Sequence, residues 1–364
     1  MTDARTTDRE VAPLRERLWA AAVDADEAGA VAVLRGAAQD GRPEEALLLD
    51  VVAAVQRRVG EEWTANRITV AAEHAATAVT DGAVAALAHD LPRPTGHRPR
   101  VTVACVDGER HALPARPVAE TLRRRGRRVD FPGAHVPTPH LVAHLHATAP
   151  DAVLLSASLP TRLPTAHAAL TACQSTGVPL LVGGAASGPD GREARAVRAD
   201  GWAAHARHAA DLLEAGGEKP YAPAARHQVD DLPHLADQEH TLITRTRAAL
   251  VRQVLHDPWE RSPVLRSSTP QQQDRTAEDI RHIIEFLATA LYFDDPDIFA
   301  RFVGRTTGVL TARGVPVESL HLGLTVLAGH LYDFPRARRF LNETAPDLDS
   351  FATTLSVTGT GTPA

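Results

Sequence analysis

The sequence predicts a multi-domain protein: a helical bundle, then a doubly wound, Rossmann-like α/β domain, then an all-α domain. Two observations carry this prediction. Apolar residues recur at helical spacing in roughly the first ninety residues and again after residue 233. Between these regions, short apolar runs alternate with helical patterns, which is typical of a parallel sheet covered by helices. With 364 residues, 44% of them apolar, the chain is long enough to bury several cores.

The first predicted domain is a four-helix bundle over residues 9–92. Its helices are rich in Ala, Leu and Val, and breaks between them are expected near residue 24, at residues 41–43 and near residue 66. About ten polar residues precede the first predicted helix, and a connector with two prolines closes the domain.

The second predicted domain, residues 98–216, alternates strands and helices. Strands are expected at residues 101–106, 127–131, 152–156 and 179–182. Helices are expected at residues 114–126, 139–148 and 164–175, with further helical pattern up to about residue 215. This alternation predicts that the strands run parallel.

The third predicted domain is helical and covers residues 233–346. Residues 217–232, which begin with a Gly- and Pro-containing stretch, are expected to be a linker, and residues 347–364 a flexible tail. Three apolar stripes predict helices in this domain. Their residues are Ile280, Ile283, Ile284, Leu287 and Leu291; Ile298, Phe299, Phe302, Val303 and Val309; and Val317, Leu320, Leu324, Leu327 and Leu331.

Composition argues against several kinds of protein. The net charge of −6 gives no sign of general affinity for nucleic acid or membrane surfaces. Cys105 and Cys173 are the only cysteines and lie far apart, so neither a disulfide scaffold nor a zinc–thiolate site is expected. Lys219 is the only lysine, which argues against Schiff-base chemistry. The sequence has neither an apolar leader nor a membrane span, so we expect a cytoplasmic protein.

The loop after the first predicted strand carries a candidate metal ligand. His111 lies there, at the carboxyl edge of the sheet, where doubly wound folds bind ligands. Glu109 is placed to accept a hydrogen bond from the far imidazole nitrogen and so to orient the ring. Ser156 ends a later strand, and Gly183-Gly184 follow another, where backbone can approach a bulky ligand closely. Taken alone, His111 is better interpreted as an ordinary loop histidine, since the chain has 18 histidines.

This order of residues resembles the cobalamin-binding module, over roughly residues 10 to 215. The family's loop is written Asp-x-His-x-x-Gly, and here it is Glu109-Arg110-His111-Ala112-Leu113-Pro114. Glu in the first place is also found in the light-sensing branch, whereas Pro114 in place of Gly is a departure. The resemblance implies that His111 is the lower axial ligand of cobalt. It also matches Ser156 and Gly183-Gly184 to later elements of the family, with Ser156 meeting the nucleotide tail.

A second cluster lies in the predicted bundle. On a helix, Val70, Glu73, His74 and Thr77 share one face. Glu73 and His74 are either a cap pair within the helix or a contact surface for the cofactor's upper ligand. Trp63, nine further residues and Glu73-His74 resemble the signature of light-responsive adenosylcobalamin proteins, such as bacterial carotenoid-gene repressors. The resemblance implies that Trp63, Val70, Glu73 and His74 enclose the adenosyl group.

Two departures from those repressors affect the expected output. The repressors carry a His after the Trp that takes the vacated upper position, and here that residue is Thr64. Water or another imidazole, such as His74, is then expected in the light state. The repressors also place a DNA-binding helix-turn-helix ahead of the bundle. Only about ten polar residues stand there in this sequence, so no direct DNA binding is expected.

The domain order, with a globin-like helical domain last, resembles the photocobilins, which use cobalamin and biliverdin together. The resemblance implies a second chromophore, biliverdin, and the sequence has no cysteine beyond Cys173, so its binding in this domain is noncovalent. A bilin needs cations for two propionates and polar partners for its pyrroles. Candidates are Arg281, His282, Tyr292, Arg301, Arg305, His321 and His330. Haem ligated by His282 or His330, and a dimerisation module, are the alternatives.

Together these patterns predict a non-enzymatic photoreceptor that binds adenosylcobalamin and biliverdin and changes its homo-oligomeric state with light. The downstream effector is not predicted. Two alternatives stay open: a corrinoid protein that carries methyl groups for a partner methyltransferase, and a light-insensitive cobalamin sensor. A Trp cap over adenosyl favours sensing, because methyl carriers leave the upper face open to a partner.

Overall fold

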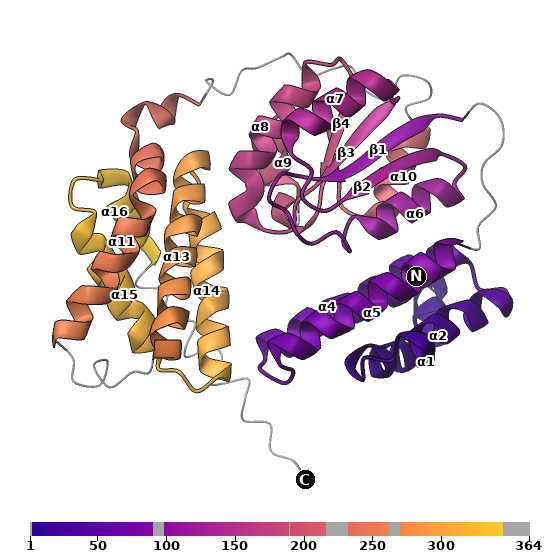
Figure 1. The fold of residues 1–364 in the computed structure, drawn as a ribbon, viewed down its shortest axis with the longest axis horizontal. Coiled ribbons are helices and arrows are strands. Elements are labelled where there is room, and N and C mark those ends of the chain that lie inside the picture. The colour runs from indigo at the N-terminus through magenta and orange to yellow at the C-terminus, as the bar shows by residue number, and fades with distance from the viewer. Residues whose placement is uncertain (1, 90–97, 189, 216–231, 262–269, 345–364) are drawn as a thin grey trace, which may run out of the picture. The chain divides into compact units, whose positions relative to one another are not determined.

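The computed structural model describes residues 2–89, 98–188, 190–215, 232–261 and 270–344. The chain forms two compact units. The first comprises residues 1–63 and 67–229 and contains the bundle and the sheet, and the second comprises residues 64–66 and 230–364 and is helical in its described part (Figure 1). The predicted linker at 217–232 lies outside the described residues up to residue 231, and the predicted tail at 347–364 lies outside them entirely. Among the described residues, no helix combines the length and the apolarity needed to cross a membrane.

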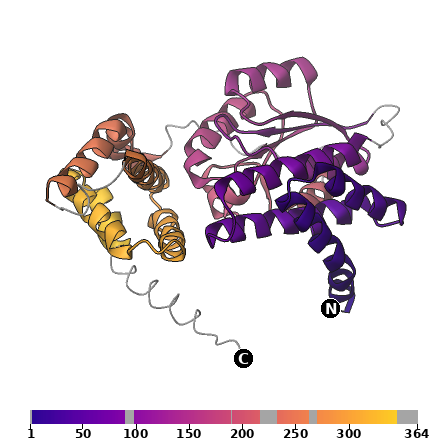
Figure 2. The same cartoon turned by 60° about the horizontal axis from the view of Figure 1, so that its bottom comes forward.

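The bundle helices lie side by side (Figure 2) around an apolar core that includes Leu18, Leu34, Val51 and Val84. The first helix begins at Thr2, so the polar residues expected to precede it are helical. The predicted break at 41–43 separates α2 from α3, and the break near Asn66 separates α4 from α5. The elements are α1 (Thr2–Val23), α2 (Glu27–Gln39), α3 (Glu44–Ala46), η1 (Leu47–Val52), α4 (Ala53–Thr64) and α5 (Val70–His89).

A π-helical turn, η1, joins α3 to α4 without a break. Its apolar residues face the bundle core, and Asp50 faces the sheet domain, where its carboxylate lies 2.7 Å from the guanidinium of Arg207. Nearby, the guanidinium of Arg124 lies 2.6 Å from the carboxylate of Glu44. Ion pairs therefore join the bundle to the helices beside the sheet.

The described sheet is fully parallel, with the strand order β2-β1-β3-β4-β5. The strands are β1 (Arg100–Cys105), β2 (Arg128–Gly133), β3 (Ala152–Ser156), β4 (Leu180–Gly183) and β5 (Gly201–Ala203). The helices and 3-10 turns are α6 (Arg116–Arg124), α7 (Thr138–Thr148), η2 (Pro160–Arg162), α8 (Leu163–Gln174), η3 (Ala185–Ser187), α9 (Arg192–Ala196) and α10 (Ala206–Ala215). Helices α6 and α10 cover one face and α7 and α8 the other (Figure 1).

Strand β5 was not predicted, because its segment was interpreted as helical. It has only three residues, begins with a glycine and contains no apolar run. Its extended conformation comes from pairing with β4, where Val182 and Gly183 lie opposite Trp202 and Ala203. A short edge strand of this kind is defined by its neighbour rather than by its own sequence.

The second unit is all-helical in its described part. Its elements are η4 (Pro233–Asp237), α11 (Glu239–Arg261), α13 (Pro270–Phe293), α14 (Pro296–Ala312), α15 (Val317–His330) and α16 (Pro335–Thr344). Most residues of the three predicted stripes are buried in its core, whereas Phe302, Val309 and Val317 are half-buried. Buried Glu239 accepts hydrogen bonds from the backbone N–H groups of Arg336 and Ala337 at the start of α16. A globin-like arrangement of these helices stays a prediction.

Candidate functional site

The strands end at one level along the carboxyl edge of the sheet. Cys105 lies opposite Ser156, Ser156 opposite Gly183, and Gly183 opposite Ala203. The chain turns from β1 to β2 on one side and reaches β3 on the other, so the topological switch point lies between β1 and β3. Open α/β sheets bind ligands at this point. The loops after β1 and β3 therefore form the expected binding edge.

Glu109 and His111 make a connected pair in the loop after β1, which we call the sheet-edge pair. Glu109 Oε1 accepts hydrogen bonds from the His111 ring, at 2.6 Å from Nδ1, and from the His111 backbone N–H at 2.8 Å. Its Oε2 accepts a hydrogen bond from the backbone N–H of Ser158, at 2.7 Å. One carboxylate thus joins the loop after β1 to the loop after β3 across the switch point.

The environment keeps Glu109 ionised. Burial by itself would raise its pKa, but the hydrogen bonds from the His111 ring and from the backbone N–H groups of His111 and Ser158 lower the pKa to about 2. The hydrogen bond to Glu109 in turn raises the pKa of His111, against the opposing effect of burial. Since the ionised carboxylate only accepts hydrogen bonds, His111 Nδ1 carries a proton and Nε2 is left to bind a ligand.

The exposure of the two side chains fits this division of roles. The Glu109 side chain is 1% exposed and that of His111 is 56% exposed. Below the loop, burial raises the pKa of the Cys105 thiol to about 12, so no thiolate competes as a metal ligand. Among the described residues, no group of three or more His, Cys, Asp or Glu side chains could hold a metal ion. The donor set fits a cofactor that brings most of its own ligands and takes one imidazole from the protein.

Pro114 leads from this loop into α6. The turn before the helix is closed by the backbone N–H of Ala115, which donates to the Ala112 carbonyl at 3.0 Å, and it does not need a donor from residue 114. The departure from the family's glycine is therefore compatible with the loop's hydrogen bonds.

The two glycines after β4 serve the packing of two loops. Gly184 has a φ of +93°, and a Cβ there would lie 2.3 Å from the carbonyl oxygen of Ala157. The loop after β4 thus lies directly on the loop after β3, and Ala186 N–H donates to Ala157 O at 3.1 Å. Gly184 is required by this contact within the protein, in addition to any contact with a ligand. Gly183 and the buried Ser156 lie beside it at the strand ends.

Sequence reasoning missed four side chains at this edge. Ser158 Oγ and Ser187 Oγ are buried and have no hydrogen-bond partner within the described structure. His135, with a φ of +50°, accepts a hydrogen bond at Nδ1 from Gly108 N–H at 2.9 Å. Arg162 reaches back from η2 to the loop after β1. For the two serines a partial signal was present in the sequence. Each lies within three residues of Ser156 or Gly184, which match elements of the cobalamin-binding family.

The first turn of α5 carries the predicted cap. Val70 is 54% exposed, which is unusual for a branched apolar residue. Glu73 and His74, which we call the cap pair, lie 2.7 Å apart between Oε2 and Nδ1, and the His74 side chain is 75% exposed. The His74 Nδ1 also lies 2.9 Å from the Val70 carbonyl oxygen. Trp63 is half-buried in the last turn of α4, next to Thr64.

The cap pair and the sheet-edge pair lie near each other in the first unit. The negative charge of Glu73 contributes to the raised pKa of His111. Further along α5, Asp81 pairs with Arg116 at the start of α6, at 3.7 Å. This contact holds α5 against the helix that follows the His111 loop. Both clusters predicted from the sequence belong to the first unit, and their enclosing one cofactor stays a prediction.

The predicted bilin residues of the second unit differ in burial. Arg281, His282, Arg301 and Arg305 are exposed on α13 and α14, and Tyr292 is buried, where burial raises its pKa to about 12. Phe286 and Phe302 stack between these two helices, with ring centroids 3.9 Å apart. His330 is half-buried at the end of α15 and His321 is exposed on the same helix.

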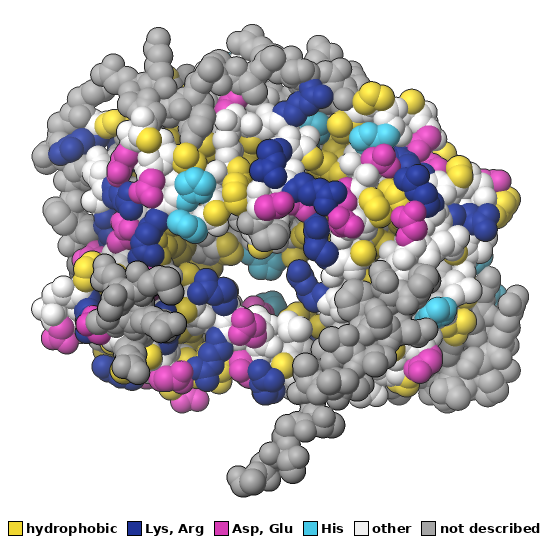
Figure 3. Space-filling view, turned by 180° about the vertical axis from the view of Figure 1, so that it is seen from behind, with side chains coloured by type: hydrophobic (Ala, Val, Ile, Leu, Met, Phe, Trp, Pro, Cys, Tyr) yellow, Lys and Arg dark blue, Asp and Glu magenta, His cyan; other side chains and the backbone are white. Residues whose placement is uncertain are grey.

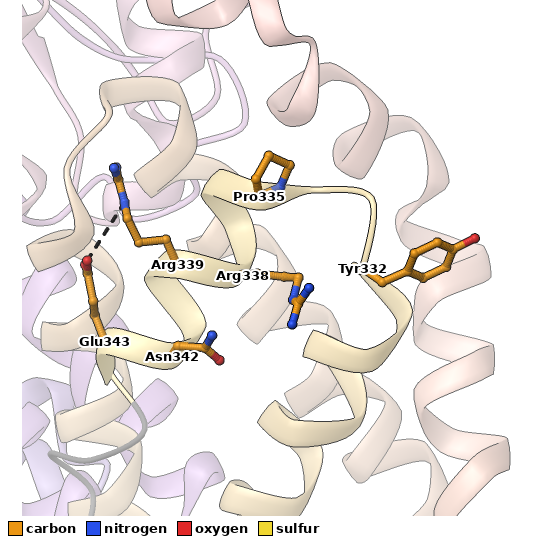
Figure 4. A pocket seen from close by; sticks show the side chains of 6 residues that line it. All are labelled: Tyr332, Pro335, Arg338, Arg339, Asn342 and Glu343. Atoms are coloured by element: carbon orange, nitrogen blue, oxygen red, sulfur yellow. Dashed lines mark ion pairs between the residues drawn. The ribbon is translucent and has the colours of Figure 1, made fainter.

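A pocket described in this unit lies elsewhere, between the end of α15 and α16. It is lined by Tyr332, Pro335, Arg338, Arg339, Asn342 and Glu343 (Figure 4). None of the predicted bilin residues lines it. On the molecular face seen in Figure 3, basic and acidic side chains are interspersed.

Comparison with known proteins identifies the first unit. Residues 14–88 match the helical B12 binding domain family, and residues 99–212 match a second B12 binding domain family. The chain is 31% identical over 141 residues to the HTH-type transcriptional repressor CarH of Myxococcus xanthus. That match covers 38% of this chain and 46% of the repressor, so the chain spans less than half of its length.

Two solved structures match part of the chain. The monomethylamine corrinoid protein of Methanosarcina barkeri is 20% identical with a TM-score of 0.49, over 56% of this chain and 98% of that one. A cobalamin-binding protein from Desulfitobacterium hafniense is 19% identical with a TM-score of 0.30, over 56% and 97%. The family matches and the geometry of the edge agree: the bundle and the sheet form a cobalamin-binding module.

Proposed function

We propose that this protein is a non-enzymatic light sensor that binds adenosylcobalamin between the bundle and the carboxyl edge of the sheet. The observation that carries the proposal is the His111 imidazole at the carboxyl edge of the sheet, held by buried Glu109 at 2.6 Å between Nδ1 and Oε1. When bound, adenosylcobalamin supplies a cobalt–carbon bond that visible light cleaves.

In this proposal the protein's residues divide the work between the two faces of the cofactor. His111 Nε2 would hold the cobalt, and Glu109 would fix the tautomer and direction of the ring. Trp63, Val70 and the cap pair enclose the adenosyl group. Without those contacts the cap residues would change conformation, and this change would bias a two-state homo-oligomer.

Two findings support a sensory role. The order Trp63, Val70, Glu73-His74 resembles the signature of light-responsive adenosylcobalamin proteins. The curated relative is named as a transcriptional repressor, which is a regulatory protein. We propose that this chain transmits its signal through assembly in the cytoplasm rather than by binding DNA itself.

We further propose that the helical unit binds biliverdin noncovalently. Its support is the domain order and the presence of two arginine pairs of a kind that binds carboxylates. Arg301 and Arg305 lie one turn apart on α14, and Arg338 and Arg339 line the pocket on α16. In two separate variants, one arginine pair is replaced by glutamines and the other is kept. We expect one of the two variants to lose biliverdin and the other to retain it. Retention by both variants would contradict a propionate role for either pair.

The first test is to add adenosylcobalamin and biliverdin in darkness, remove free ligand and record spectra before and after blue-green light. The proposal expects both chromophores to co-elute, the cobalamin bands to convert, and the elution volume to change on illumination. Cobalamin that binds but does not convert would contradict the light-sensing role. A preference for methylcobalamin, unaffected by Trp63→Ala, would indicate a methyl carrier instead.

A further inference from the structure

One cation at the binding edge is not used by the axial site. Arg162 ends η2 in the loop after β3, and its guanidinium lies over Gly108 in the loop after β1. A Cβ at Gly108 would lie 3.0 Å from Arg162 Nη1. Arg162 is half-buried, and within the described residues it forms no ion pair. By contrast, Arg124 and Arg207, at the junction with the bundle, are both paired with carboxylates.

The two carboxylates next to Gly108 in the sequence form no ion pair with Arg162 within the described residues. Asp107 precedes Gly108, and its Oδ1 lies 3.3 Å from His135 Nδ1. Glu109 follows Gly108, but its two oxygens accept hydrogen bonds from His111 and from the Ser158 backbone. The positive charge of Arg162 nevertheless affects the site, because it lowers the pKa of His111 and so works against the effect of Glu109. A half-buried guanidinium without a counter-ion at a ligand-binding edge has part of its hydration removed and gains from an anionic partner.

A second polar group lies in the same loop. Ser158 Oγ is buried and has no hydrogen-bond partner in the described part of the chain, although the Ser158 backbone is held by Glu109. A buried hydroxyl without a partner costs free energy unless a ligand or water satisfies it. A guanidinium and a hydroxyl together are donors suited to a phosphate.

We propose that Arg162, assisted by Ser158 Oγ, binds the phosphodiester of the cobalamin nucleotide tail and selects corrinoids that carry a phosphate. The phosphodiester is the only anionic substituent of the cofactor, since the other side chains of the corrin ring are neutral amides. The proposal rests on cobalamin binding by the first unit and is independent of the light response. Arg162 is a specificity-determining residue in this role, separate from the axial ligand.

The experiment measures dissociation constants of the full chain for three corrinoids: adenosylcobinamide, adenosylcobinamide phosphate and adenosylcobalamin. Cobinamide phosphate differs from cobinamide by the phosphate alone, so the ratio of their constants isolates the phosphate contact. A charge-assisted hydrogen bond predicts that wild-type protein prefers the phosphate form by about tenfold or more. Arg162→Gln should reduce this ratio to near one and leave cobinamide affinity within about twofold, and Arg162→Lys should retain part of the ratio.

Arg128→Gln is the matched control. Arg128 is an exposed arginine at the start of β2, on the amino edge of the sheet, and its replacement should leave all three constants unchanged. Thermal unfolding of each apoprotein checks the fold.

Equal weakening of all three ligands by Arg162→Gln would overturn the phosphate role and show that Arg162 shapes the loop. Unchanged constants would overturn the contact itself. Failure of the wild type to bind any corrinoid would instead contradict the cobalamin site, which separates the two failures.

Discussion

Two carboxylate–imidazole pairs lie in the first unit, and they differ in how the fold holds them. In the sheet-edge pair, Glu109 and His111 are 2.6 Å apart, and in the cap pair, Glu73 and His74 are 2.7 Å apart. The chemistry is the same, with Nδ1 facing a carboxylate and Nε2 directed elsewhere. Only Glu109 is buried, and only Glu109 is also bound by backbone N–H groups from two loops.

This difference indicates which pair is held in position before a ligand binds and which pair can change conformation. Glu109 is positioned by the loops at the ends of β1 and β3, so the His111 ring has its direction before any ligand arrives. Glu73 and His74 depend on one exposed turn of α5, and side chains there change rotamer on the nanosecond timescale. We therefore assign retention of the cofactor to the sheet edge and response to the cap.

The comparison is tested most severely by removing each imidazole. We expect His111→Ala to weaken adenosylcobalamin binding beyond the ~10–100-fold cost of losing a residue that only orients a metal ligand. His74→Ala is the matched control, since it removes a carboxylate-paired imidazole from the cap, and it should leave binding largely intact. Equilibrium titration followed by absorption measures both. Unchanged binding and spectrum in His111→Ala would contradict the axial assignment.

The carboxylates give the next largest contrast. Glu109→Gln keeps the shape but removes the charge that orients His111, and it should weaken binding by roughly 10–100-fold. Glu73→Gln should cost only a few-fold, because exposed charge pairs contribute little. Equal losses in the two variants, measured by the same titration, would show that the two pairs are held alike.

The cap is tested by response rather than by affinity. Trp63→Ala should leave dark binding within a few-fold of the wild type, while it changes the rate or the product of photoconversion. Time-resolved absorption after a light pulse and size-exclusion chromatography in dark and light give the readout. Photoconversion and assembly identical to those of the wild type would contradict the assignment of the response to the cap.

The smallest expected effect concerns two buried imidazoles in the helices. Burial lowers the pKa of His167 on α8 and of His240 on α11. In the unfolded chain these rings take up a proton near pH 6.5, whereas the folded chain resists it. Their contribution to stability is thus complete above pH 6.5 and declines as pH falls below that value.

Urea unfolding between pH 5 and 8 measures this dependence, and His167→Gln should make it shallower. A steeper dependence in the variant would contradict the lowered pKa. The pKa of the sheet-edge histidine is shifted in the opposite direction, because the hydrogen bond to Glu109 outweighs the effect of burial there.

The sequence by itself determined most of the secondary structure, and it predicted the Glu109 and His111 pair that the structure places at the carboxyl edge of the sheet. Strands β1 and β3 are continuous apolar runs, and His111 with Glu109 follows the first of them, so a local pattern and a known topology were sufficient. The cap cluster was readable because Val70, Glu73 and His74 share a helical face. These features depend on spacing within one element, which the sequence contains directly.

Tertiary structure decided what depends on two loops meeting. Gly184 is required by Ala157, Arg162 lies over Gly108, and Ser158 binds Glu109, and each pair is far apart in the chain. Strand β5 exists through its pairing with β4. Most of the arginines and histidines proposed for the bilin are exposed on separate helices, because helical spacing identifies a face but not the partner that covers it. Contacts between distant segments arise only when the sheet orders its strands, and no local pattern encodes that order.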